Sequence, residues 1–233
     1  MKDLKIIAFT HKTTDISNIG RLHIDASNRR ERLENIKRND VSELMYLSTC
    51  NRVEFILVSE CNLNKNYLSS FFARFSKDWN QDDINWAIEN CNIFEGEEAV
   101  KHIFNIASSL DSLVIGEREI ITQVRKAFDE CSKDGLTGSI LQLLINKTIE
   151  SAKEVYTNTQ IAKNPISIVS LAYRKLRDLG IKDNSRILVV GAGETNTRMC
   201  KFLSKHGLKN LTIFNRTFEK AEALSNQIGG NAM

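Results

Sequence analysis

The chain has 233 residues, of which 42% are hydrophobic and 26% charged, a composition typical of a soluble globular protein with one large or two modest domains. No apolar run approaches the ~20 residues that span a bilayer and no signal peptide precedes the first strand, which predicts a cytoplasmic protein. The formal charge of +3 is too small to indicate nucleic-acid binding by itself. The five cysteines include no CxxC pair, so neither a disulfide framework nor a metal site is predicted.

The N-terminal part of the chain predicts a compact unit of strands and helices. Residues 53–58 alternate Val53, Phe55 and Leu57 with less uniformly apolar neighbours, which is typical of a strand with one fully apolar face. The elements expected are strands at 4–9, 43–47 and 53–58, helices at about 24–38 and 64–77, and a strand or turn near 91–94.

From Gly96 onward the pattern becomes helical. Apolar residues recur at helical spacing after Gly96 and again from Ile120 to Phe128, and a third long helix is expected over 139–157. The only proline, Pro165, fits the first turn of another helix, with Asn164 as its N-cap and Gly180 at its end.

A nucleotide-binding signature follows. The segment RILVVGAGET at 186–195 reads as a buried strand that enters a glycine turn and opens a helix, and a second strand, LTIFNRT, is expected at 211–217. The GxGxxG fingerprint is incomplete because Asn196 stands in place of its third glycine. At the end of the second strand, Arg216 and Thr217 favour NADP over NAD, since a guanidinium and a hydroxyl can bind a phosphate. The alternative is an ordinary turn in some other α/β domain.

The extent of this second region is itself informative. A final helix is expected from Phe218, after which the chain ends at GGNAM. Because a doubly wound domain needs more than two parallel strands, the sequence stops where the third should begin. We therefore expect the chain to be a piece of a longer protein.

The most unusual connection between predicted strands is STCNR at 48–52, which places a thiol beside a cation between two apolar strands. Arg52 would favour the thiolate form of Cys50. A lone cysteine is more often a small buried apolar residue than a nucleophile, so from the residues alone both roles remain open for Cys50. The other four cysteines have no comparable surroundings. His102 lies beside the apolar stripe of its helix, where packing and hydrogen bonding are the simpler role. A nucleophilic cysteine together with a nicotinamide cofactor indicates thioester formation followed by hydride delivery to give an aldehyde.

Several longer motifs occur in a fixed order along the chain. They are HKT at 11–13, STCNRVE at 48–54, HIFNIASSLDSLVIGEREIITQVRKA at 102–127, SIVSLA at 167–172, GAGE at 191–194 and NRT at 215–217. In these motifs the sequence resembles the glutamyl-tRNA reductase family, which opens the tetrapyrrole (porphyrin) route from glutamate. The resemblance implies an NADPH-dependent oxidoreductase that converts glutamyl-tRNA(Glu) to glutamate-1-semialdehyde through a cysteine thioester.

The resemblance also implies residue roles. Cys50 would be the nucleophile and His102 a second catalytic residue that assists ester cleavage. Substrate-binding positions would be Thr49, Asn51, Arg52, Ser112, Glu117, Arg118, Glu119 and Gln123. Cofactor-binding positions would be Gly191, Ala192, Gly193, Glu194, Thr195, Asn196, Asn215, Arg216 and Thr217. No metal ligand is implied.

The chain departs from the usual family pattern at several positions. Arg118 and Glu119 replace the usual proline and glutamine, and Thr122 stands where glycine is usual before Gln123. Ser109 likewise occupies a common glycine position, and Thr195 replaces the usual methionine.

The predicted fold class is a multidomain α and β chain. It comprises an α+β catalytic domain at 1–158 with a helical C-terminal half, a long connecting helix at 159–182, and an incomplete Rossmann-like NADP-binding unit at 183–233. We expect this chain to lack the family's C-terminal dimerisation domain. Implied partners are glutamyl-tRNA(Glu) and glutamate-1-semialdehyde aminomutase. A homodimer is expected for the full-length protein, and a monomer for this chain. The alternatives are a tRNA- or protein-binding module in which Cys50 is structural, and another thiol-dependent NADP enzyme that needs no tRNA.

Overall fold

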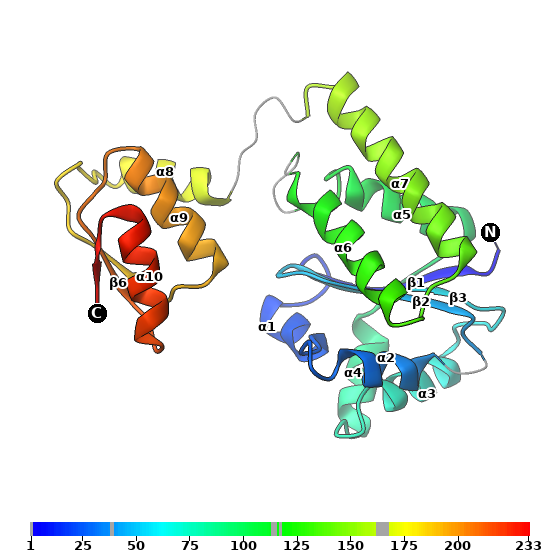
Figure 1. Cartoon of the computed structure of the whole chain (residues 1–233). Coiled ribbons are helices and arrows are strands. Elements are labelled where there is room, and N and C mark those ends of the chain that lie inside the picture. Colours follow the sequence, from blue (N-terminus) through cyan, green and yellow to red (C-terminus); the bar gives the residue numbers. More distant parts are fainter. Residues whose placement is uncertain (1, 38–39, 113–115, 117, 162–167) are drawn as a thin grey trace. The chain divides into compact units, whose positions relative to one another are not determined.

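The computed structural model describes residues 2–37, 40–112, 116, 118–161 and 168–233. The chain divides into two compact units, residues 1–165 and 166–233, each with its own sheet and its own core (Figure 1). The mixed α and β class predicted from the sequence is confirmed. Within the described ranges, no helix has both the length and the apolar character needed to cross a membrane.

An antiparallel sheet of strand order β2-β3-β1-β4 forms the centre of the first unit. Its strands are β1 (Leu4–Thr10), β2 (Glu43–Ser48), β3 (Arg52–Val58) and β4 (Asn92–Glu95). Helices α2 (Arg29–Ile36), α3 (Lys65–Phe75) and α4 (Gln81–Asn90) lie on one face, and α5 (Gly96–Ala107), α6 (Glu119–Lys133) and α7 (Ser139–Asn158) on the other (Figure 1). A short helix α1 (Ile16–Ile19) and a 3₁₀ turn (Gly20–Leu22) follow β1.

Aromatic side chains fill the space between the sheet and helices α3 and α4. Phe55 on β3 contacts Phe71 and Phe75 edge to face, with ring centroids 5.3 and 5.5 Å apart, and Phe9 on β1 meets Phe72 at 5.8 Å. All of these rings are fully buried or nearly so. The alternation predicted for residues 53–58 therefore places Phe55 in the core, as expected of a strand covered on this face.

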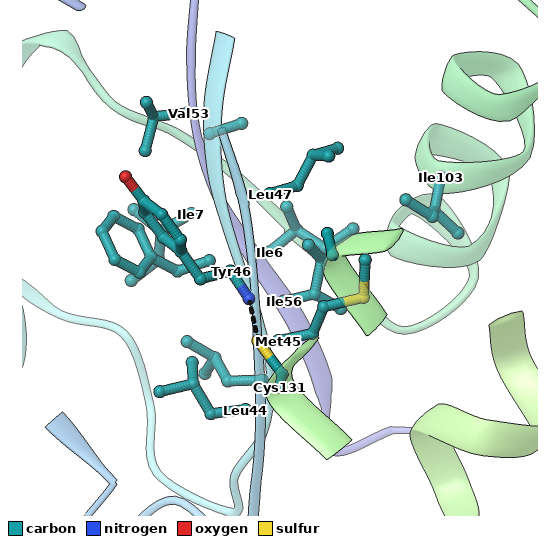
Figure 2. Close-up of a cluster of buried hydrophobic side chains, with 14 of the residues drawn as sticks. Ile6, Ile7, Leu44, Met45, Tyr46, Leu47, Val53, Ile56, Ile103 and Cys131 are labelled. Carbon is teal, nitrogen blue, oxygen red and sulfur yellow. Dashed lines mark hydrogen bonds between the residues drawn. The ribbon is translucent and has the colours of Figure 1, made fainter. Parts of the chain in front are cut away.

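Aliphatic side chains fill the opposite face of the same sheet. Figure 2 shows Ile6, Met45, Ile56 and Ile103 packed together between the strands and helix α5. Cys131 of α6 joins this layer, where its sulfur accepts a hydrogen bond of 3.4 Å from the Tyr46 backbone N–H (Figure 2). Because both faces are covered, a polar side chain on β3 is buried whichever way it points.

The second unit is a small parallel sheet of order β5-β6-β7 with helices packed on it. Its elements are α8 (Ile168–Asp178), β5 (Ile187–Val190), α9 (Glu194–Lys205), β6 (Leu211–Phe214), α10 (Phe218–Ile228) and β7 (Asn231–Ala232). Val189 and Ile213 point into the core, whereas the alternating Leu188, Val190 and Phe214 are 61%, 68% and 48% exposed.

The structure differs from the predicted elements in a few places. Helix α4 was not predicted, because its polar sequence hides its apolar stripe, yet Asn80 and Asp83 form a reciprocal capping box at its start. The helix expected at 24–38 is shorter, and a third parallel strand, β7, does begin within the chain. Helix α8 packs against α9 and belongs to the second unit, rather than standing apart as a connection. The expected helix start at Asn164 and Pro165 lies outside the described residues.

Candidate active site

The predicted nucleophile lies on an exposed hairpin turn between β2 and β3. Ser48 pairs with Val53, and the Thr49 N–H donates to the Arg52 carbonyl at 2.9 Å, so that Cys50 and Asn51 form the tip of the turn. The Asn51 carbonyl accepts a 3.0 Å hydrogen bond from the His11 N–H, which ties the tip to the segment after β1. Cys50 is exposed at this tip. An exposed thiol on a turn held at both ends is accessible to a large substrate.

The other described cysteines have different environments. Burial raises the pKa of the Cys91 thiol and of the Cys131 thiol to about 11, and it also raises the pKa of Cys200. A thiol with a raised pKa stays protonated near neutral pH and is a poor nucleophile. Exposure therefore distinguishes Cys50 from these three cysteines.

Arg52 is buried at the start of β3 and pairs with two carboxylates. Its Nη1 donates to Glu54 Oε1 at 2.9 Å, and its Nη2 lies 3.3 Å from an Asp111 carboxylate oxygen. Nη2 also donates to the Asp111 backbone carbonyl. The Arg52 side chain is only 3% exposed. Two neighbouring carboxylates balance its charge, so the cation is held in place by the protein itself.

Glu54 links Arg52 to His102 on helix α5. Its carboxylate oxygens lie 3.2 and 3.1 Å from His102 Nε2, and its side chain has no exposed surface. The His102 ring stacks on Phe94 of β4, with centroids 3.9 Å apart and planes 13° apart. The packed, hydrogen-bonded environment considered for His102 is therefore present, and the Glu54 contact fixes the orientation of its ring.

The paired side chains form a series that runs from His102 through Glu54 and Arg52 to Asp111, and it is called the charged chain below. Asp111 extends this series to the surface, because its carboxylate also pairs with Lys12. Burial by itself raises the pKa of the Asp111 carboxyl, but the hydrogen bond from Lys12 and the charge of Arg52 outweigh it and lower the pKa below its usual value. The loop that carries Asp111 is closed where the Gly116 N–H donates to Ser109 Oγ at 3.1 Å. Ser109 has a φ of +57°, in the left-handed region that favours glycine.

The remaining predicted substrate positions are spread around this loop and helix α6. Ser112 follows Asp111 directly and is half-buried, while Gln123 is half-buried on α6. Arg118 is the N-cap residue of α6, and its guanidinium lies 5.6 Å from the ring centroid of Tyr156 on α7. Glu119 begins the same helix. Glu117 lies outside the described residues.

The predicted cofactor turn has the expected strand-turn-helix form in the second unit. Gly191 has a φ of +97°, which favours glycine, and Gly193 caps α9 without a side-chain hydrogen bond. No atom lies within 4 Å of the position that a Gly193 Cβ would occupy, so the backbone is open to a close approach. These features fit the pyrophosphate of a dinucleotide.

Two asparagines hold this turn together. Asn196 Nδ2 donates to the Val190 and Gly191 carbonyls at 2.8 and 2.9 Å, which gives a packing role to the residue that replaces the third glycine. Asn215 Oδ1 accepts from the Ala192 N–H at 3.0 Å and thereby joins the two strand ends. The remaining predicted positions are Glu194, which pairs with Arg198, the adjacent Thr195 on α9, and the exposed residues Arg216 and Thr217.

Three residues of the charged chain were missing from the predicted set. Lys12 falls within the HKT motif and Asp111 within the LDS motif, but neither was given a role. Glu54 carried the clearest signal, because it is the one charged residue among the apolar residues 53–58, and a carboxylate on a strand buried on both faces requires partners.

Comparison with known proteins gives matches to both units. The family model described as "Glutamyl-tRNAGlu reductase, N-terminal domain" matches residues 7–159. The model described as "Shikimate / quinate 5-dehydrogenase" matches residues 170–233.

Individual relatives agree with these matches. The chain is 34% identical to a glutamyl-tRNA reductase of Sulfolobus acidocaldarius and 36% identical to one of Campylobacter hominis, covering 97% of this chain and 52% of the relative in each case. A solved structure of glutamyl-tRNA reductase from Methanopyrus kandleri matches with a TM-score of 0.64 and 28% identity, over 100% of this chain and 54% of that one. The chain thus spans about half the length of the relatives it matches.

Proposed function

The chain belongs to the glutamyl-tRNA reductase family, and from this premise we propose that it forms the thioester of glutamate during the NADPH-dependent reduction of glutamyl-tRNA(Glu) to glutamate-1-semialdehyde. The exposure of Cys50 on the anchored hairpin turn is the observation that carries the proposal. In the family this reaction supplies the tetrapyrrole route, with NADPH as the reductant.

The first step is acyl transfer to sulfur. The Cys50 thiolate attacks the carbonyl carbon of the glutamyl ester, a carbon–sulfur bond forms, and the ester carbon–oxygen bond breaks. The 3′ oxygen of the tRNA leaves and takes a proton. His102, oriented by Glu54, is the proposed proton donor, and Arg52 is the proposed partner of the substrate's free carboxylate.

The second step reduces the thioester. A bound NADPH would supply the hydride for this reduction. Cys50 would then be the leaving group: the carbon–sulfur bond would break, Cys50 would return to the thiolate, and the aldehyde would be released. Gly191 and Gly193 are proposed to accommodate the pyrophosphate, and Arg216 and Thr217 the adenosine phosphate.

Intact-protein mass spectrometry with glutamyl-tRNA in the absence of NADPH tests the acyl step. We expect a glutamyl adduct on the wild-type chain and on Cys61→Ser, a matched control at a half-buried cysteine, but none on Cys50→Ser. An adduct that persists in Cys50→Ser would place the acyl group elsewhere. If tRNA binds but none of the three proteins carries an adduct, the chain is a binding module and the proposal is wrong.

A further inference from the structure

The two carboxylates that pair with Arg52 differ in exposure. Glu54 has no exposed surface, while the Asp111 side chain is 19% exposed and Arg52 itself is 3% exposed. A ligand that approaches Arg52 from solvent therefore meets Asp111 before it can reach the guanidinium. Glu54 cannot be the partner that yields, because it is enclosed and also bonded to His102.

Asp111 has a second cationic partner on its outer side. Lys12 Nζ pairs with Asp111 Oδ1, whereas Arg52 faces Oδ2, and the Lys12 side chain is 58% exposed. If Asp111 left Arg52, its carboxylate would keep the Lys12 contact and gain solvent. Displacement would thus leave no buried charge unpaired on the Asp111 side, which keeps its cost low.

A carboxylate on the ligand would replace the ion pair that Arg52 loses when Asp111 moves away. A neutral amide in the same place would leave the buried guanidinium with only one anionic partner, and unpaired buried charge strongly disfavours binding. Replacing the Asp111 carboxylate at Arg52 with a carboxylate of the ligand should therefore cost little free energy, whereas replacing it with a neutral group should cost much more.

We propose that Asp111 is a gating carboxylate: it holds the place on Arg52 that the free carboxylate of the glutamyl group takes, and so selects acyl groups that carry a carboxylate. This inference rests on the proposed function and adds a specificity-determining residue to it. Lys12 is the residue that holds the displaced Asp111.

The test compares two reagents that alkylate Cys50 with loss of iodide, anionic iodoacetate and neutral iodoacetamide. Their rates at Cys50 are measured by peptide mapping, and their ratio reports how well the site accepts a carboxylate. We expect Asp111→Asn to raise the ratio of iodoacetate to iodoacetamide rates about 3- to 10-fold, because a competing negative charge is removed while an acceptor oxygen remains.

Two control variants separate charge from loop structure. Asp111→Glu keeps the carboxylate and should keep the wild-type ratio, and Glu34→Gln, which removes an exposed carboxylate paired with Arg30, should do the same. An unchanged ratio in Asp111→Asn would overturn the proposal. An equal rise in Asp111→Glu would also overturn it, since the effect would then come from a disturbed loop.

The glutamyl-tRNA adduct experiment distinguishes a failure of the Asp111 proposal from a failure of the proposed thioester function. If wild type forms the adduct but Asp111→Asn leaves the alkylation ratio unchanged, the gate is wrong and the thioester function stands. If the ratio rises but wild type forms no adduct, the proposed function is wrong and the carboxylate position on Arg52 is supported.

Discussion

The turn at Cys50 in the first unit and the glycine turn in the second unit are built in opposite ways. The polar side chains behind Cys50 come from the segment after β1, from β3, from α5 and from the loop before α6, and three of them, Arg52, Glu54 and His102, are buried. The glycine turn is built from one short segment and the end of the next strand, and its predicted phosphate ligands are exposed. The buried side chains of the first site should therefore support the fold, whereas the exposed Arg216 and Thr217 of the second site should contribute little to stability.

Glu54→Ala should have the largest effect on stability. It leaves the buried Arg52 with Asp111 alone and removes the partner of His102, and breaking a buried ion pair costs about 3–5 kcal/mol. Urea unfolding followed by tryptophan fluorescence measures the loss in the first unit, since Trp79 and Trp86 both lie there. Glu34→Ala, on the exposed surface, should leave the midpoint unchanged. A small loss in Glu54→Ala would mean that the charged chain is not structural.

Gly116→Ala should cause the second-largest loss of stability. Gly116 has a φ of +87°, and an added Cβ would lie 2.1 Å from the Ile161 carbonyl oxygen, so we expect a loss of about 2–4 kcal/mol. Gly135→Ala is the matched control, because its φ is +72° but no atom lies within 4 Å, and it should cost only about 1–2 kcal/mol. Equal losses in the two variants, measured by the same unfolding experiment, would show that the close approach to Ile161 contributes nothing.

Asp40→Asn tests an ion pair of intermediate burial. Hydrogen bonds of 2.7 and 2.8 Å from Arg74 lower the pKa of Asp40 from 3.8 to about 2. A lowered carboxyl pKa stabilises the fold above the unfolded value, and this contribution is lost as the pH falls from about 4 to 2. We expect Asp40→Asn to cost about 1 kcal/mol at neutral pH, after allowance for exposure.

The pH dependence provides the check on this pair. The difference between Asp40→Asn and wild type should shrink as the pH of the unfolding curves is lowered from neutral to about 2, because Asp40 is then largely protonated in the unfolded chain and about half protonated in the folded chain. A difference that stays constant with pH would assign the loss to packing rather than to charge.

Arg216→Ala should have the smallest effect on stability. Because Arg216 is exposed, we expect unchanged unfolding but roughly tenfold weaker NADPH binding, with NADH binding unaffected, by cofactor fluorescence titration. Lys220→Ala, in the first turn of α10, is the control that should leave both affinities unchanged. If Arg216→Ala weakened both cofactors equally, it would not contact the 2′-phosphate.

Much of the local structure could be predicted from the sequence alone. The alternation at 53–58 indicated β3, and the strand-glycine-helix pattern at 186–195 indicated β5 and the turn before α9. Both are short-range patterns whose geometry depends on neighbouring residues. Helix α4 escaped prediction because only its packing against the aromatic core compensates for its polar sequence.

Tertiary structure alone decided how the charged residues pair. Asp111 is 99 residues from Lys12 and 59 residues from Arg52, and His102 is 48 residues from Glu54. No local pattern shows that these residues meet. The sequence determined that Cys50 lies in a turn between two strands, because strand periodicity and turn chemistry are local. The covering of both sheet faces then buried Arg52 and Glu54, and burial is what made their pairing obligatory.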